Sequence, residues 1–267
     1  MIPFTRGDKT KYNDVYSFAI IPNLSLFEIY VQVIRQSLSK DFKKTTKLSP
    51  KNIDCLKNLP YLAINFIIPA DSRIALKRKN DKIEFENMEN NALSMFELWI
   101  QNNPENIETY EEHIKQYKLL LTQSKRNNFN LSLYVRSFFT ATVAAYITHA
   151  VEKYSNAIGI VWGSDRDAML SSNNQIIIDN YSIQHNGFAR NDSEWIYNEN
   201  CKIGFMQPDT EAYNWYDELI RIPDFCAGAL ASYNFVEDAD LPARIPEPTE
   251  NTYHAGRLEY IVALEGL

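Results

Sequence analysis

Apolar and polar residues alternate in blocks along the N-terminal part of the chain, and each block has the length of one strand or helix. Residues 15–21 are β-branched or aromatic and end at Pro22, a pattern typical of a buried strand. Residues 24–38 repeat apolar side chains at helical spacing, which predicts an amphipathic helix. A short helix is expected after Ser49-Pro50, and residues 62–68 predict a second strand.

The middle of the chain has the periodicity of helices. Apolar side chains recur three and four residues apart in residues 91–101, 107–124 and 131–154. Residues 157–162 then form a continuous apolar run, which is typical of a strand covered on both faces. Further predicted elements are a hairpin over residues 73–85, strands at residues 175–178, 201–206 and 257–264, and a helix at residues 224–235.

Strands and helices that alternate in this way favour an α/β fold with a mixed sheet flanked by helices. A length of 267 residues and a hydrophobic content of 45% suit one domain with a substantial core. We therefore expect a single α/β domain over residues 1–267, with a mainly helical insertion at about residues 89–126.

Cysteine and histidine spacing excludes several classes of site. Cys55, Cys201 and Cys226 form no CxxC pair and no disulfide framework. The four histidines form no HExxH motif and no cluster with cysteine, which argues against a structural zinc site. The apolar runs are too short to cross a membrane, and the N-terminus lacks a signal-peptide core. We therefore expect a cytoplasmic protein with reduced thiols and no membrane partner.

The net charge of −7 gives no overall sign of a nucleic-acid partner. Basic residues nevertheless gather in two segments, Lys40, Lys43, Lys44, Lys47 and Lys51, and Arg73, Lys77, Arg78, Lys79 and Lys82. Such clusters form either local phosphate-binding surfaces for nucleic acid or solvated faces without a ligand. The 16 tyrosines and nearby tryptophans favour either a surface for a protein partner or packing at the edge of the core.

The acidic turn Ser164-Asp165-Arg166-Asp167 directly follows the strand predicted at residues 157–162. In open α/β sheets, ligands bind beyond the carboxyl ends of the strands. Neighbouring carboxylates repel each other and are relieved by a divalent cation, so Asp165 and Asp167 are candidate ligands for Mg²⁺ or Mn²⁺. Arg166 is a candidate phosphate contact. The alternative is structural, with Asp165 capping the next helix and Arg166 pairing with a neighbour.

Three further residues are candidates for the same site. Asp224 begins the helix predicted at residues 224–235 and would complete an oxygen-rich metal site, although an acid at a helix start also offsets the helix dipole. His149, near the end of a long predicted helix, is a candidate general base or phosphate contact. His185, in a predicted polar turn, is a candidate substrate contact. Histidines of this kind also occur as purely structural residues.

The segment Ile220-Arg221-Ile222-Pro223-Asp224-Phe225-Cys226-Ala227-Gly228 is similar to a terminal Ile-Gln-x-Ala-Asp-x-x-Ala-Gly segment. That segment is typical of a bacterial domain family of unknown function with a ribonuclease-H-like fold. The resemblance covers residues 157–235 and, more loosely, residues 15–21. It implies a ribonuclease-H-like sheet, Asp224 as the terminal acidic residue, nuclease activity and a setting in mobile elements or phage defence. The family's Asp-Glu-Ser-Gly signature on the first strand is absent, and Asp8 and Asp14 are the nearest acids.

Two functions are compatible with these patterns. The first is a metal-dependent phosphodiesterase, a nuclease acting on nucleic acid with Mg²⁺ or Mn²⁺. Its catalytic and metal-binding residues would be Asp165, Asp167 and Asp224, and its substrate-binding residues would be Arg166, His149 and His185. The second is a catalytically inactive ribonuclease-H-like module that binds a protein or nucleic-acid partner. The absent first-strand acid and the net charge of −7 favour this second function.

Overall fold

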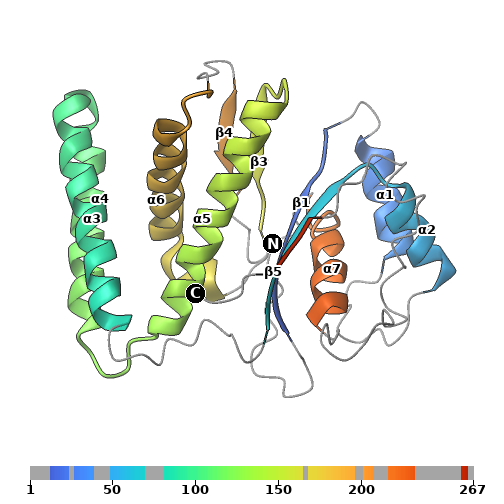
Figure 1. Cartoon of the computed structure of the whole chain (residues 1–267), viewed down its shortest axis with the longest axis horizontal. Coiled ribbons are helices and arrows are strands. Elements are labelled where there is room, and N and C mark those ends of the chain that lie inside the picture. The colour runs from blue at the N-terminus through green and yellow to red at the C-terminus, as the bar shows by residue number, and fades with distance from the viewer. Residues whose placement is uncertain are drawn as a thin grey trace. The chain divides into compact units, whose positions relative to one another are not determined.

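The chain divides into two compact units, each with its own core (Figure 1). The computed structural model describes residues 13–23, 27–38, 49–69, 81–164, 168–195, 201–206, 216–231 and 260–263. The strand unit comprises Met1–Ile74, Gly163–Asp165 and Met206–Leu267, and the helical unit comprises Ala75–Trp162 and Arg166–Phe205. No helix among the described residues is long and apolar enough to cross a membrane.

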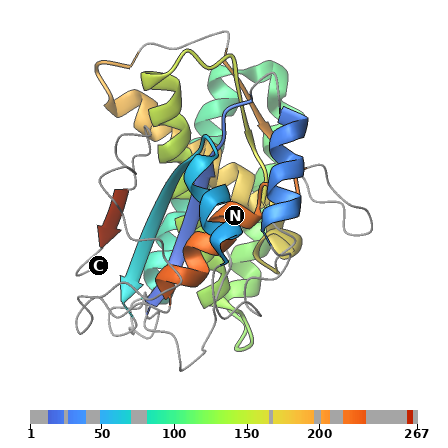
Figure 2. The same cartoon turned by 90° about the vertical axis from the view of Figure 1, so that its right-hand side faces the viewer.

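The strand unit is built on a three-stranded mixed sheet in the order β1-β2-β5 (Figure 2). Strand β1 (Asn13–Ile20) pairs antiparallel with β2 (Leu62–Pro69), and β2 pairs parallel with β5 (Tyr260–Ala263). The register places Val15 opposite Ile67. The three strands expected in this part of the sequence are thereby confirmed.

Three helices complete the strand unit: α1 (Phe27–Ser37), α2 (Pro50–Asn58) and α7 (Arg221–Ala231). Helix α2 begins as expected, because Ser49 caps it and Pro50 occupies its first turn. Helix α7 packs on the sheet through Ala227 and Leu230, which join Val15 and Ile67 in one buried cluster. The small side chain at Ala227 permits this close approach.

A buried ion pair ties the start of α7 to α1. The Glu218 carboxylate is 1% exposed, pairs with the Arg221 guanidinium, and accepts a hydrogen bond from Arg35 Nε at 3.0 Å. Arg221 Nη1 also donates to the Leu38 carbonyl at 2.6 Å, just after the end of α1. The two charges are buried together, so neither carries the cost of an isolated charge.

The helical unit contains four long helices and a small sheet. The helices are α3 (Asp81–Asn102), α4 (Ile107–Ser124, preceded by the short 3₁₀ helix η2, Pro104–Asn106), α5 (Leu131–Tyr154) and α6 (Ala168–Asn191). Strands β3 (Gly159–Trp162) and β4 (Lys202–Phe205) pair in parallel. Helices α3 to α6 share one core that includes Phe85, Phe96, Tyr117 and Leu120. The bounds predicted for α4 and α5 are confirmed.

Three expectations about strands are wrong. Residues 82–85, predicted as the second part of a hairpin, lie in α3. The first part of the predicted hairpin lies outside the described residues. Residues 175–178 lie within α6, because Ile176 and Ile177 are buried in the helical core and this packing outweighs their preference for strands. Residues 157–162 were expected to be covered on both faces. Val161 in β3 is instead 58% exposed, and β4 is the one described strand that pairs with β3.

A chain of buried polar side chains crosses the helical core. Tyr117 donates a hydrogen bond to Asn180 Oδ1 at 3.1 Å, Asn180 Nδ2 donates to the Tyr134 hydroxyl at 3.3 Å, and Tyr134 donates to Glu89 Oε1. Burial, followed by the charge of Asp179, raises the pKa of Glu89 to about 8. Glu89 is therefore protonated near neutral pH.

This raised pKa makes a prediction about stability. Between pH 4.5 and about 8 the native state retains a proton on Glu89 that the unfolded chain releases. The free energy of unfolding should therefore decrease as the pH rises through this interval, by up to roughly 5 kcal/mol. In Glu89→Gln this part of the pH-dependent decrease in the free energy of unfolding should be absent. Urea unfolding at pH 5 and pH 8 measures it, and an equal pH dependence in both proteins would contradict the assignment.

Candidate metal centre

Two parallel helices of the helical unit bring three metal-ligating side chains together. Tyr134 contacts Asn180 near the middle of α6, whereas Lys153 contacts Asp192 beyond its end, so α5 and α6 run in the same direction (Figure 1). His149 and Glu152 lie three residues apart on α5 and share one face. His185 on α6 faces them. One ligand atom from each of His149, Glu152 and His185 lies within 4.8 Å of the others.

Asp192 is the hydrogen-bond partner of one ring nitrogen of His149. Its carboxylate accepts two hydrogen bonds from Lys153 Nζ at 2.9 and 2.8 Å and lies 3.0 Å from His149 Nε2. Lys153 first, and then His149, lowers the pKa of Asp192 to about 2. An ionised carboxylate only accepts hydrogen bonds, so His149 Nε2 carries the proton that it donates.

The same contact leaves the other nitrogen of His149 ready to bind. Once Nε2 carries the proton, Nδ1 of a neutral imidazole has a free lone pair. His149 Nδ1 is buried and has no hydrogen-bond partner in the described part of the chain, and the side chain is 7% exposed. Metal-ligating histidines typically donate their second N–H to a carboxylate in this way.

His185 and Glu152 also form a pair before any ion binds. His185 Nε2 lies 2.8 Å from Glu152 Oε2, and the Glu152 side chain is only 5% exposed. A cation that takes both groups as ligands would replace this contact between them.

Aromatic rings surround the two histidines. Tyr181 stacks on His185 with ring centroids 5.7 Å apart and an interplanar angle of 9°. Trp195 and Phe188 lie 5.7 and 6.4 Å from the His149 ring. These contacts restrict the orientation of both imidazoles and limit the water around them, which strengthens interactions with a charge.

The predicted site residues lie in different parts of the chain's structure, and some fall outside the described residues. Asp165, Arg166 and Asp167 lie outside the described residues. Asp224 lies half-buried in the first turn of α7, in the strand unit. His149 and His185, expected as separate substrate contacts, meet in the helical unit. Of the basic clusters, the structure describes Lys51 and Lys82, and both are exposed.

The sequence interpretation missed Glu152 and Asp192. The spacing His149-x-x-Glu152 within a predicted helix was a usable signal, because it places both side chains on one helix face. No local pattern marks Asp192, which meets His149 across 43 positions of sequence. Short sequence motifs do not mark this group of residues, because its members come from two helices.

Comparison with known proteins identifies no relative: no protein-family model, no curated protein and no solved structure matches the chain. The candidate metal centre therefore rests on its own geometry.

The pairing of His149 with Asp192 predicts a defined tautomer. In long-range ¹H–¹⁵N NMR spectra at pH 8, His149 should carry its proton on Nε2 and none on Nδ1, because ionised Asp192 holds the Nε2 proton. His149→Asn assigns the signal, and Asp192→Asn should weaken the preference. A dominant Nδ1–H form in the wild-type protein would contradict this arrangement.

Proposed function

We propose that the chain is a metal-binding protein whose helical unit holds a divalent transition-metal ion at His149, Glu152 and His185. One observation carries the proposal: three ligand atoms lie within 4.8 Å of one another, and one of the three residues has a buried ring nitrogen with no hydrogen-bond partner among the described residues. A pair of histidines with one glutamate is a ligand set of catalytic zinc sites.

The ligand types favour some ions over others. Imidazole nitrogens suit Zn²⁺ and similar transition metals, whereas Mg²⁺ prefers oxygen ligands and retains its waters. We therefore expect affinity to rise from Mg²⁺ through Mn²⁺ to Zn²⁺, following the general order for nitrogen-containing sites. The Mg²⁺ or Mn²⁺ expected from the sequence stays a prediction for Asp165, Asp167 and Asp224.

Hydrolysis is the reaction class that this ligand set supports best. Three protein ligands leave a coordination position for water, and a bound dication lowers the pKa of that water toward neutrality. His149, held by Asp192, and His185, held by Tyr181, would keep the ligands oriented. A metal site with three protein ligands on rigid helices thus supports a metal-dependent hydrolase.

A nuclease with a ribonuclease-H-like fold is the finer proposal from the sequence. The mixed β1-β2-β5 sheet of the strand unit is compatible with it. Its acids Asp165, Asp167 and Asp224 stay a prediction, as does the alternative of an inactive module that binds a protein or nucleic acid. Metal-dependent cleavage of nucleic acid that Asp224→Asn abolishes and Glu152→Gln preserves would favour the aspartate site.

Metal titration tests the histidine–glutamate site directly. Isothermal titration of the metal-free protein with Zn²⁺ should show about one ion per chain, and Mg²⁺ should bind far more weakly. Changing an outer-shell residue of a metal site typically weakens metal affinity by roughly 10–100-fold. Glu152→Gln removes a proposed direct ligand, so it should weaken Zn²⁺ affinity at least as much. Bound Zn²⁺ should also stabilise the wild-type fold, by about 2.7 kcal/mol at a free concentration of 100 Kd.

Glu194→Gln is the matched control, because it makes the same substitution at a glutamate outside the three proposed ligands. Glu194 lies 3.2 Å from Lys153, and its side chain is 81% exposed. This variant should bind Zn²⁺ with wild-type affinity. Equal Zn²⁺ affinity in wild type, Glu152→Gln and Glu194→Gln would refute the site.

A further inference from the structure

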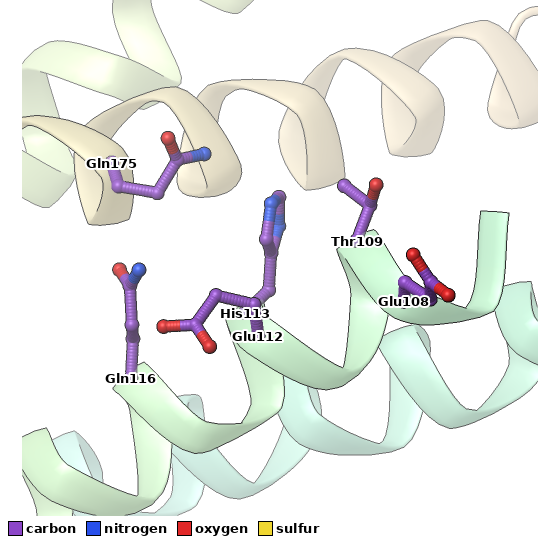
Figure 3. Close-up of a pocket in the computed structure, with 6 residues that line it drawn as sticks. All are labelled: Glu108, Thr109, Glu112, His113, Gln116 and Gln175. Atoms are coloured by element: carbon purple, nitrogen blue, oxygen red, sulfur yellow. The ribbon is translucent and has the colours of Figure 1, made fainter.

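A polar pocket opens between α4 and α6, and none of its lining residues belongs to the metal centre. Its volume is about 370 Å³, and its lining residues are Glu108, Thr109, Glu112, His113, Gln116 and Gln175. Figure 3 shows the His113 imidazole pointing from α4 toward α6, with Gln116 and Gln175 beside it and Glu108 and Glu112 along the same helix. This volume lies at the small end of the range for ligand pockets.

A buried carboxylate lies behind the pocket. Asp179 on α6 is 2% exposed, and its Oδ1 lies 3.0 Å from His113 Nδ1 and accepts a hydrogen bond from Gln175 Nε2 at 2.8 Å. Both of these partners line the pocket. Asp179 Oδ2 is buried and has no hydrogen-bond partner among the residues that the structure describes. A buried carboxylate in this position calls for a positive charge.

The surrounding side chains supply little positive charge. None of the residues that line the pocket is lysine or arginine. Lys115 lies 3.3 Å from Glu112 Oε2, but this pair is exposed, with the Lys115 side chain at 77%, and such pairs are weak. The charge of Asp179 also raises the pKa of Glu89 and of Tyr117, after burial as the first cause in each. The pocket therefore lies in a region of negative potential.

The lining groups suit the hydrogen bonds of an ammonium ion. The Glu108 carboxylate is one acceptor in the lining, and His113 Nδ1 lies 3.0 Å from Asp179 Oδ1. The Glu112 carboxylate and the amide oxygens of Gln116 and Gln175 are further acceptors. A primary ammonium group has three N–H donors and needs acceptors of this kind.

We propose that the pocket beside the His113–Asp179 pair binds a small organic amine through its protonated ammonium group. Glu108 and Glu112 attract the cation, and the negative charge of buried Asp179 adds to this attraction. The size of the pocket selects a small linear amine or a short polyamine. This site is independent of the metal centre, so each can fail without the other.

Isothermal titration with spermidine in chelator-treated buffer tests the proposal. The expected result is one saturable site per chain in the wild-type protein. Glu112→Gln should weaken the affinity at least tenfold, because it removes a carboxylate that lines the pocket. Asp179→Asn should weaken binding likewise, and an unchanged far-UV circular dichroism spectrum would show that this variant is folded.

Glu111→Gln is the matched control, since Glu111 is the exposed neighbour of Glu112 on α4 and does not line the pocket. It makes the same change in net charge and should retain affinity within twofold. A neutral diol of similar length should not bind. Equal weakening by Glu111→Gln and Glu112→Gln would reduce the effect to overall charge and overturn the proposal, as would the absence of saturable binding at millimolar spermidine.

Discussion

The parallel packing of α5 on α6 is the interaction on which the candidate metal centre depends. Small buried residues on α5, among them Ala141 and Ala145 at 0% exposure, permit close contact between helices. Near the start of α5 Tyr134 meets Asn180 in the middle of α6, and near the end of α5 Lys153 meets Asp192 just beyond α6. The register of α5 along α6 places His149 and Glu152 opposite His185. A shift of one residue along either helix would separate the three ligands.

Three acids of the helical unit have different surroundings. Asp192 stays ionised because Lys153 and His149 donate hydrogen bonds to it. Glu89 is neutral near pH 7, because burial and the charge of Asp179 raise its pKa to about 8. Asp179 has His113 and Gln175 as neighbours, and its Oδ2 has no hydrogen-bond partner in the described part of the chain. Ligands are proposed beside two such unsatisfied atoms, His149 Nδ1 and Asp179 Oδ2.

Local patterns predicted those elements whose own sequence determines them. The bounds of α4 and α5 follow from long, regular helical spacing, and Ser49-Pro50 marked the start of α2. Residues 175–178 were misassigned, because three consecutive isoleucines prefer strands locally and only the packing of Ile176 and Ile177 in the helical core decides otherwise. The same limit applies to the site. His149 and His185 were each recognised as candidates, but their meeting depends on the register between two helices, which no local pattern encodes.

The most direct test of the metal centre is anomalous X-ray diffraction from crystals of the protein soaked in Zn²⁺, with data collected on both sides of the zinc absorption edge. One strong anomalous peak is expected in the helical unit, about 2.0–2.2 Å from a nitrogen of His149, a nitrogen of His185 and an oxygen of Glu152. That peak should disappear in crystals of Glu152→Gln or become much weaker. Crystals with zinc at other positions and none among these three residues would contradict the central claim.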